Sequence, residues 1–251
     1  MKGKIYFASD HHLGAPDRET SLVRERLFVK WLDEIKPKAT ALYILGDLFD
    51  VWYEYKEVVP KGYVRVLGKL AELADAGISI HYFVGNHDMW MIDYLEKEIG
   101  AKVYFRPKVM ELGTKRFFIG HGDGLGPKDK SYKRMKKVFK NPFFQWLYRW
   151  IHPDLGVPFA RYLSLKSKLI SGSKDLIYDG PDREWLVQYA KRKLKFEHYD
   201  YFVFGHRHLP LEISLNDKST YINLGDWITH YTYGVFDGNT LSLKHWKSAN
   251  D

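Results

Sequence analysis

The 251-residue sequence has no cysteine, which excludes disulfide bonds and thiolate-bound metals. Any metal ion must therefore be held by His, Asp, Asn or Glu side chains. The sequence also has no apolar stretch near the ~20 residues that a membrane-spanning helix needs. Its N-terminal MKGKIYFASDHHLG is broken by Asp10 and His11 and does not resemble a secretory leader. We therefore expect a cytoplasmic protein.

Excess positive charge is missing from most of the chain and is concentrated in one segment. Residues 127–180 contain twelve Lys or Arg and four Asp or Glu, whereas the remaining residues include 27 of each sign. Ten aromatic residues lie in the same segment. Such a segment suits a partner that is both anionic and apolar, such as a phospholipid surface or a lipid phosphate, better than duplex nucleic acid.

Five apolar runs have the length and the β-branched or aromatic content of strands: 4–9, 41–46, 78–85, 116–120 and 201–205. Helix-like segments separate the first three runs, at 20–36 and 62–76. This alternation predicts parallel βαβ units with helices covering a central sheet. After residue 206 the pattern changes to short strands with turn signals, which predicts a second, antiparallel sheet.

The basic segment 127–180 interrupts this order. Asn141-Pro142 has the pattern of a helix start, and four aromatic residues then recur at helical spacing, namely Phe139, Phe143, Trp146 and Trp150. We predict a helical insertion over the edge of the sheet, within a single domain that spans 1–251. The helical spacing further predicts that many of these aromatic side chains turn inward.

Polar clusters follow all five predicted strands. They are DHH at 10–12, GDLFD at 46–50, GNHD at 85–88, GHGD at 120–123 and GHRH at 205–208. A single Gly-His or Gly-Asp pair is more often a structural turn than a binding site. In α/β proteins the carboxyl ends of the strands meet at one edge of the sheet, so we expect these five clusters to lie together. Burying so many carboxylates and imidazoles in one place costs free energy unless a cation offsets their charge. The pattern therefore predicts a metal site.

The residue types predict which metals bind. Ligands with only nitrogen and oxygen donors suit Mn²⁺, with Fe, Zn²⁺ or Co²⁺ as alternatives. Two such ions about 3.5–4 Å apart form the arrangement used for phosphoester cleavage. We predict that Asp47 bridges two divalent ions, because it leaves the central part of the sheet. The other predicted ligands are Asp10, His12 and His208 for one ion, and Asn86, His121 and His206 for the other.

Taken together, the five clusters resemble the signature of calcineurin-like metallophosphoesterases, in the same order and over residues 4 to about 226. The resemblance implies an α/β fold with four αββα layers, formed by two mixed sheets, with the helical insertion as a cap. It also places His87 beside the metals, where it stabilises or protonates the leaving oxygen. We expect Asp88 to orient the His87 ring.

Within this superfamily the chain resembles the UDP-2,3-diacylglucosamine diphosphatases of lipid A biosynthesis. The resemblance rests on SDHHLG at 9–14, GHGDGL at 120–125 and the basic insertion that follows. It implies cleavage to UMP and 2,3-diacylglucosamine 1-phosphate (lipid X) and a cap whose apolar interior holds acyl chains. We further predict peripheral docking on the inner membrane through basic helices around 128–140, because basic residues cluster there: Lys133, Arg134, Lys136, Lys137 and Lys140. The implied substrate contacts are Asn86, Asp129, Tyr132, Ser167 and Lys174.

One position departs from the pattern: the proteobacterial members have Arg where this chain has His87. The substrate could therefore be another lipid-linked or nucleotide phosphodiester. We expect no nucleic-acid partner, because stacking on single strands needs exposed aromatic rings. We also expect no obligate protein partner. A non-catalytic interaction module would be expected to lack metal ligands, and none is missing.

Overall fold

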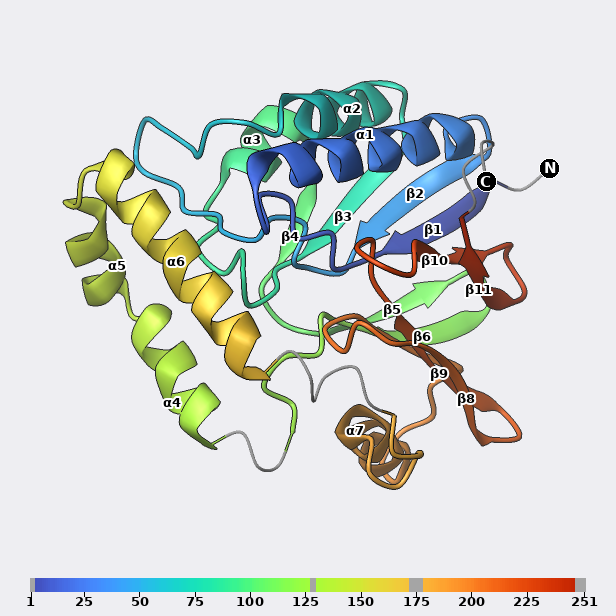
Figure 1. Ribbon diagram of the computed structural model, residues 1–251. Coiled ribbons are helices and arrows are strands. Elements are labelled where there is room, and N and C mark those ends of the chain that lie inside the picture. Colours follow the sequence, from blue (N-terminus) through green and yellow to red (C-terminus); the bar gives the residue numbers. More distant parts are fainter. Residues whose placement is uncertain (1–2, 127–129, 172–177, 247–251) are drawn as a thin grey trace.

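The computed structural model describes residues 3–126, 130–171 and 178–246. Within these ranges the strands form two facing sheets with helices on their outer sides (Figure 1). The first sheet has the order β11 (Leu241–His245), β10 (Thr232–Phe236), β1 (Lys4–Ala8), β2 (Ala39–Ile44), β3 (Ser79–Phe83) and β4 (Lys102–Tyr104). The second has the order β5 (Lys108–Leu112), β6 (Lys115–Ile119), β7 (Tyr201–Phe204), β9 (Ser219–Leu224) and β8 (Pro210–Asn216).

The predicted βαβ units are confirmed. Strands β1, β2 and β3 pair in parallel, and α1 (Arg18–Ile35) and α2 (Val64–Asp75) connect them. Helix α1 starts at Asp17, whose side chain accepts a hydrogen bond from the Thr20 backbone N–H. The short helix α3 (Tyr94–Ile99) then leads to β4.

The prediction of an antiparallel second sheet was wrong. Strands β6, β7 and β9 pair in parallel, and only the outer strands β5 and β8 pair antiparallel. Strands β10 and β11, which also follow residue 206, join the first sheet beside β1. The side-chain pattern of a strand indicates which face is buried, but it does not identify the neighbouring strand.

Three layers of apolar side chains hold the fold together. Phe28 and Trp31 of α1 pack on the outer face of the first sheet. Phe7 and Phe117 lie between the two sheets. On the far side, α7 (Trp185–Leu194) packs Leu186 and its neighbours against the second sheet. The layers are therefore helix, sheet, sheet and helix, as the resemblance implies.

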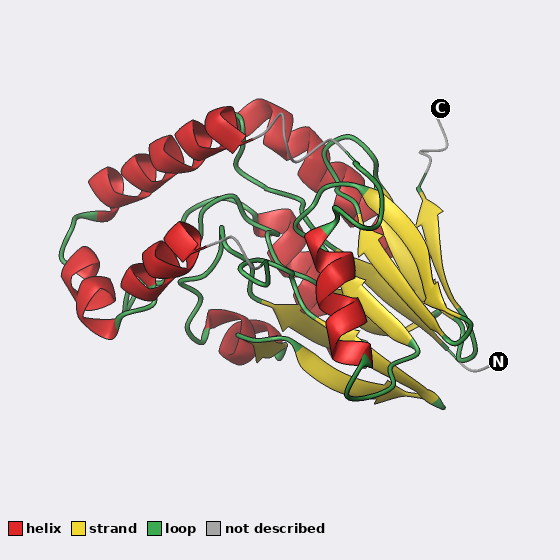
Figure 2. Ribbon diagram, turned by 90° about the horizontal axis from the view of Figure 1, so that it is seen from below, coloured by secondary structure: helices red, strands yellow, loops and turns green. Residues whose placement is uncertain are grey.

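The segment predicted to be a helical insertion forms α4 (Lys130–Phe139), α5 (Pro142–Arg149) and α6 (Pro153–Ser171), which extend to one side of the sheets (Figure 2). Asn141 caps α5 as predicted, accepting a hydrogen bond from the Phe143 N–H. Trp90 Nε1 donates to the Phe139 carbonyl at 2.6 Å, and Tyr53 Oη donates to the Gln145 carbonyl at 2.7 Å. These contacts attach the helices to the loops that follow β2 and β3.

The prediction that many aromatic residues of the insertion turn inward holds for Phe139 and Tyr148, whose rings pack against Trp90. It was wrong for three others. Phe143 is 60% exposed, Trp146 52% and Trp150 74%, and α5 buries none of its residues. Helix α5 has an apolar stripe, but among the described residues no element packs over it. The argument that inward-facing rings disfavour nucleic-acid stacking therefore no longer holds.

Candidate metal and active site

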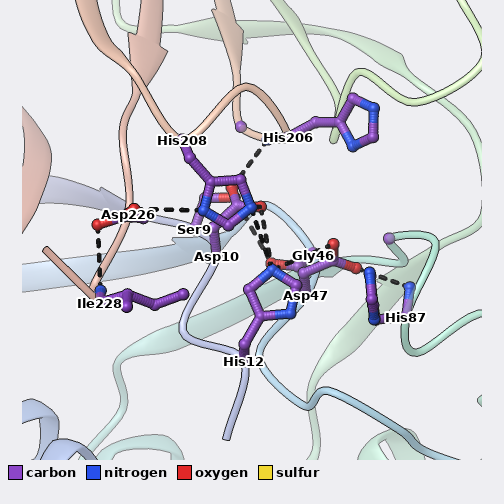
Figure 3. Close-up of polar contacts among 12 residues, drawn as sticks. Ser9, Asp10, His12, Gly46, Asp47, His87, His206, His208, Asp226 and Ile228 are labelled. Carbon is purple, nitrogen blue, oxygen red and sulfur yellow. Dashed lines mark hydrogen bonds and ion pairs between the residues drawn. The ribbon is translucent and has the colours of Figure 1, made fainter. Parts of the chain in front are cut away.

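The loops at the carboxyl ends of five strands bring the predicted ligands together. Asp10 and His12 follow β1, Asp47 follows β2, Asn86 follows β3, His121 follows β6, and His206 and His208 follow β7. Asp47 occupies the centre: its Oδ2 lies 3.7 Å from His12 Nε2 and 3.3 Å from His121 Nε2. Figure 3 shows His12, His208 and Asp10 gathered on one side of Asp47, with His87 on the other.

The donor atoms fall into small groups, each with its atoms within 4.8 Å of one another. Asp10, His12 and His208 form one group, and Asp47, His121 and His206 form another. The Asn86 side-chain oxygen lies 3.1 Å from His121 Nε2, beside the second group. A third possible group, which the sequence did not suggest, joins His87 to His12 and Asp47.

Two details show that these groups fit a cation. His12 Nε2 and His208 Nε2 face each other at 3.2 Å, so at least one of the two nitrogens presents a lone pair. Asp10 Oδ1 is buried and has no hydrogen-bond partner among the described residues, and the ring nitrogens of His208 and His12 lie 3.5 and 3.8 Å from it. Buried carboxylate oxygens are costly when unpaired, and imidazole and carboxylate are good ligands for divalent transition metals.

Protonation of histidine side chains partly offsets the negative charge of the buried carboxylates. Burial disfavours a charged His121, yet Asp47 reverses this effect and raises the His121 pKa to about 10. Burial also opposes ionisation of Asp47, but His121 and His87 outweigh it and hold the Asp47 pKa well below its usual range. Burial raises the pKa of Asp10. The site therefore attracts positive charge, which a metal would supply as it displaces protons from its ligands.

The backbone is strained at the same positions. Asp10, His12, Asp47, His206 and His208 all have positive φ, between 44° and 69°. This left-handed conformation costs a non-glycine residue about 1–3 kcal/mol and persists only where the surrounding structure enforces it. Five predicted ligands from three loops share this strained conformation. We infer that it is kept because it orients their side chains toward a common site.

Two glycines allow the loops to approach closely. A Cβ atom at Gly85 would collide with Asp47 Oδ1, and one at Gly205 would collide with Asp10 Oδ2. The glycine that precedes Asn86 and the glycine that precedes His206 therefore leave room for the carboxylates of neighbouring loops. This steric requirement explains why glycine, which has no Cβ, occupies these two strand ends.

The expectation that Asp88 orients the His87 ring was wrong. The Asp88 carboxylate is buried and accepts hydrogen bonds from the Leu48 and Gly85 N–H groups and from Tyr82 Oη. Burial and the nearby Asp47 raise its pKa to about 7. Asp88 therefore ties the loop after β3 to the loop after β2, and its hydrogen bonds go to two backbone N–H groups and Tyr82 rather than to the His87 ring.

Asp50 and the insertion residue Ser164 hold the His87 ring instead. His87 Nδ1 lies 3.0 Å from the Asp50 carbonyl and 3.2 Å from Ser164 Oγ. Ser164 Oγ also donates to Asp50 Oδ2 at 2.8 Å, and Asp50 Oδ1 lies 3.2 Å from His12 Nδ1. The sequence offered no signal for Ser164, which lies 114 residues from Asp50.

Asp226 was also not predicted as a site residue. Its Oδ2 lies 3.2 Å from His208 Nδ1, and its Oδ1 accepts hydrogen bonds from three consecutive N–H groups, those of Ile228, Thr229 and His230. Burial opposes its ionisation, but the bond to His208 and these N–H groups hold its pKa below the usual range. A carboxylate on the second imidazole nitrogen fixes the orientation of a metal-binding histidine.

We expect Asp226→Ala to weaken metal binding about 10- to 100-fold, because losing such a partner frees the His208 ring. Titration of the metal-free protein with Mn²⁺, followed by calorimetry, measures this affinity. Asp217→Ala removes a carboxylate from an exposed position as a matched control. Unchanged affinity in the Asp226 variant would show that His208 needs no such support.

The implied substrate contacts are only partly described. Asn86 lies at the site. Asp129 and Lys174 lie outside the described residues, as do the side chains of Tyr132 and Ser167. These four positions remain predictions from the resemblance.

Comparisons with known proteins agree with the site's chemistry. A family model described as calcineurin-like phosphoesterase matches residues 3–210. A UDP-2,3-diacylglucosamine hydrolase of Porphyromonas gingivalis is 41% identical, covering 97% of this chain and 98% of its own. The protein of the same name from Hahella chejuensis is 30% identical, with the same coverage. The alignment with the solved structure of Yfce, a phosphoesterase from E. coli, covers 95% of this chain and 91% of that one, at 20% identity and a TM-score of 0.44.

Proposed function

The chain belongs to the calcineurin-like phosphoesterase family, and on this basis we propose that it hydrolyses the pyrophosphate of UDP-2,3-diacylglucosamine to UMP and 2,3-diacylglucosamine 1-phosphate. The convergence of seven nitrogen- and oxygen-donor side chains around Asp47 carries the hydrolytic part of this proposal. The names of the two aligned relatives support the choice of substrate.

The family to which the chain belongs and its three groups of donor side chains both support the binding of divalent metal ions. We propose two ions, with Mn²⁺ as the preferred metal and Asp47 between them. Asp10, His12 and His208 would hold one ion, and Asn86, His121 and His206 the other. When bound, such ions supply Lewis acidity that activates water and offsets charge on the phosphoryl oxygens.

His87 is placed to exchange a proton with the substrate. In the tautomer whose Nδ1–H donates to the Asp50 carbonyl, Nε2 is the nitrogen available to the reacting groups. During hydrolysis, water adds to the uridine-side phosphorus and the bond to the oxygen of the sugar phosphate breaks. A protonated His87 would donate a proton or a hydrogen bond to that departing oxygen.

We expect Ser164→Ala to lower kcat about fivefold, because a net hydrogen bond contributes about 1 kcal/mol to holding the His87 ring. Metal content and KM for a small phosphodiester should change little. Ser164→Thr keeps the hydroxyl and should recover most of the rate. If Thr and Ala behave alike, the hydroxyl does not position His87.

The proposed reaction is tested by incubating purified protein with Mn²⁺ and UDP-2,3-diacylglucosamine and measuring UMP by liquid chromatography. We expect UMP and the sugar 1-phosphate in equal amounts. No UMP release, together with good turnover of bis(p-nitrophenyl) phosphate, would favour the second candidate, a phosphoesterase acting on another lipid-linked or nucleotide phosphodiester. His87 in place of Arg and the exposed aromatic residues of α5 favour that candidate.

We also propose that α5 and α6 dock on an anionic lipid surface. Among the described residues, no helix is both long and apolar enough to span a bilayer. Several large apolar side chains of these helices and of the turn between them are exposed instead: Phe143, Trp146, Trp150, Leu155 and Phe159. Basic residues lie near them in sequence, including Arg134 and Arg149. Amphipathic helices with this combination bind at membrane interfaces.

The double substitution Trp146→Ser and Trp150→Ser should reduce binding to vesicles containing phosphatidylglycerol at least about tenfold, because two large apolar side chains are lost. Co-sedimentation with these vesicles at low and high salt measures the binding. Phe196→Ser serves as control, since Phe196 is 85% exposed beyond the end of α7. Equal binding by both variants would contradict docking through α5.

A further inference from the structure

A cavity of about 520 Å³ opens beside the predicted metal site. The ends of β3 and β4, the loop after β6 and residues of α4 line it, and the predicted metal ligand His121 is among the lining residues. Its volume lies within the range of pockets that enclose small-molecule ligands. A ligand in this cavity would therefore be continuous with any group bound between the predicted ligands.

Positive charge dominates the wall of this cavity. Five cationic side chains line it: Arg106, Lys133, Lys136, Lys137 and Lys140. Among its described lining residues Asp123 is the only acid, and it is paired with Lys136. Burial lowers the pKa of Lys140, and the neighbouring Lys136 and Arg106 lower it further. The cations are thus close enough to repel one another, and an anion would relieve that repulsion.

An aromatic wall faces these cations. Phe83, Tyr104 and Phe105 line the cavity, and the rings of Phe83 and Tyr104 stack with centroids 4.8 Å apart. Phe105 is 45% exposed. Flat aromatic side chains beside cations offer a surface on which a nucleobase stacks, at about 1–3 kcal/mol per base.

The apolar surface of the protein lies elsewhere. The exposed apolar residues of α5 and α6 are not among the described residues that line the cavity. Long acyl chains would therefore find their contacts on those helices, while a charged and aromatic group fits the cavity. A substrate with a lipid end and a nucleotide end would place its two ends in different surroundings.

We propose that this cavity binds the nucleoside monophosphate end of the substrate. The base stacks against Tyr104 and Phe105, the phosphate points toward His121, and the cations of α4 and Arg106 offset its charge. This assignment rests on the proposed function for the identity of the nucleotide. It also changes the role of part of the basic segment, because three lysines of α4 and Lys140, which follows this helix, line the cavity.

The test is a comparison of UMP binding by calorimetry between the unmodified protein and the double variant Arg106→Ala and Lys137→Ala. Both side chains are exposed at the cavity and lie outside the predicted metal ligands. We expect UMP affinity to fall at least about tenfold, since each charge-assisted bond is strong. KM for UDP-2,3-diacylglucosamine should rise similarly, while kcat/KM for bis(p-nitrophenyl) phosphate stays unchanged. The control variant is Lys97→Ala and Arg183→Ala, which removes two exposed cations elsewhere.

Three results would overturn the assignment. The first is a UMP affinity of the double variant within twofold of that of the unmodified protein. The second is an equal loss of affinity for UMP and for inorganic phosphate, with no effect of Phe105→Ala on UMP binding, and the third is a loss of vesicle binding by the double variant with its UMP affinity intact. The second would mark a phosphate site and the third a membrane contact. Loss of UMP binding in a protein that never hydrolyses UDP-2,3-diacylglucosamine would support the cavity and refute only the proposed reaction.

Discussion

Asp47→Asn should all but abolish hydrolysis, lowering kcat/KM about 10²- to 10⁴-fold, because removing one partner from a buried charge cluster costs about 3–5 kcal/mol. Asp47 Oδ2 lies 3.7 Å from His12 Nε2 and 3.3 Å from His121 Nε2, so this carboxylate connects the two proposed donor groups. The amide keeps the shape of the side chain but loses the negative charge that two cations would share.

The loss should be seen in metal content as well as in rate. We expect mass spectrometry to find fewer than two ions per chain in Asp47→Asn, while circular dichroism stays native. Asp237→Asn, at an exposed turn, is the matched control and should keep both ions. A fully metallated and active Asp47 variant would refute a bridging role.

The second large effect is expected for His87→Ala, which should lower kcat about 10²- to 10⁴-fold, the usual contribution of a positioned acid or base. Its backbone N–H to Asp47 Oδ1 bond, at 2.9 Å, does not depend on the side chain and should remain. Metal content should therefore stay the same. The reaction should be followed with UDP-2,3-diacylglucosamine and with bis(p-nitrophenyl) phosphate.

The two substrates separate the possible roles of His87. p-Nitrophenolate leaves without a proton, so an acid role predicts a much smaller loss with that substrate. His87→Asn, which keeps a polar side chain but no acid of suitable pKa, should resemble Ala. If His87→Ala instead loses one ion, then His87 is a ligand, in the third donor group with His12 and Asp47.

The parallel half of the fold could be predicted because each βαβ unit is local in sequence. A strand, a helix ending near Gly77 and the next strand leave few alternative arrangements. The second sheet could not be predicted in the same way. Its strand β7 pairs with β6, which lies over 80 residues earlier, and no local pattern specifies that partner.

That the candidate ligands lie together could be predicted, because metal-binding chemistry restricts residue types at each strand end. Supporting residues carry no such restriction. Asp88 looked like a partner of the adjacent His87 but points toward Leu48, and Ser164 reaches His87 from a helix of the insertion. Such contacts depend on how distant loops pack.

The exposed aromatic residues show a third limit. Helical spacing correctly indicated an apolar stripe on α5, but spacing alone does not say whether the stripe meets protein, lipid or water. Phe143 and Trp150 are exposed because, among the described residues, no element covers that stripe.

The most direct measurement of the central claim is anomalous diffraction at the manganese absorption edge from crystals grown with Mn²⁺. We predict two peaks about 3.5–4 Å apart on either side of the Asp47 carboxylate, one beside Asp10 and His208 and the other beside His121 and His206. No peak, or peaks away from these side chains, would contradict the assignment of this site as a two-metal hydrolase centre.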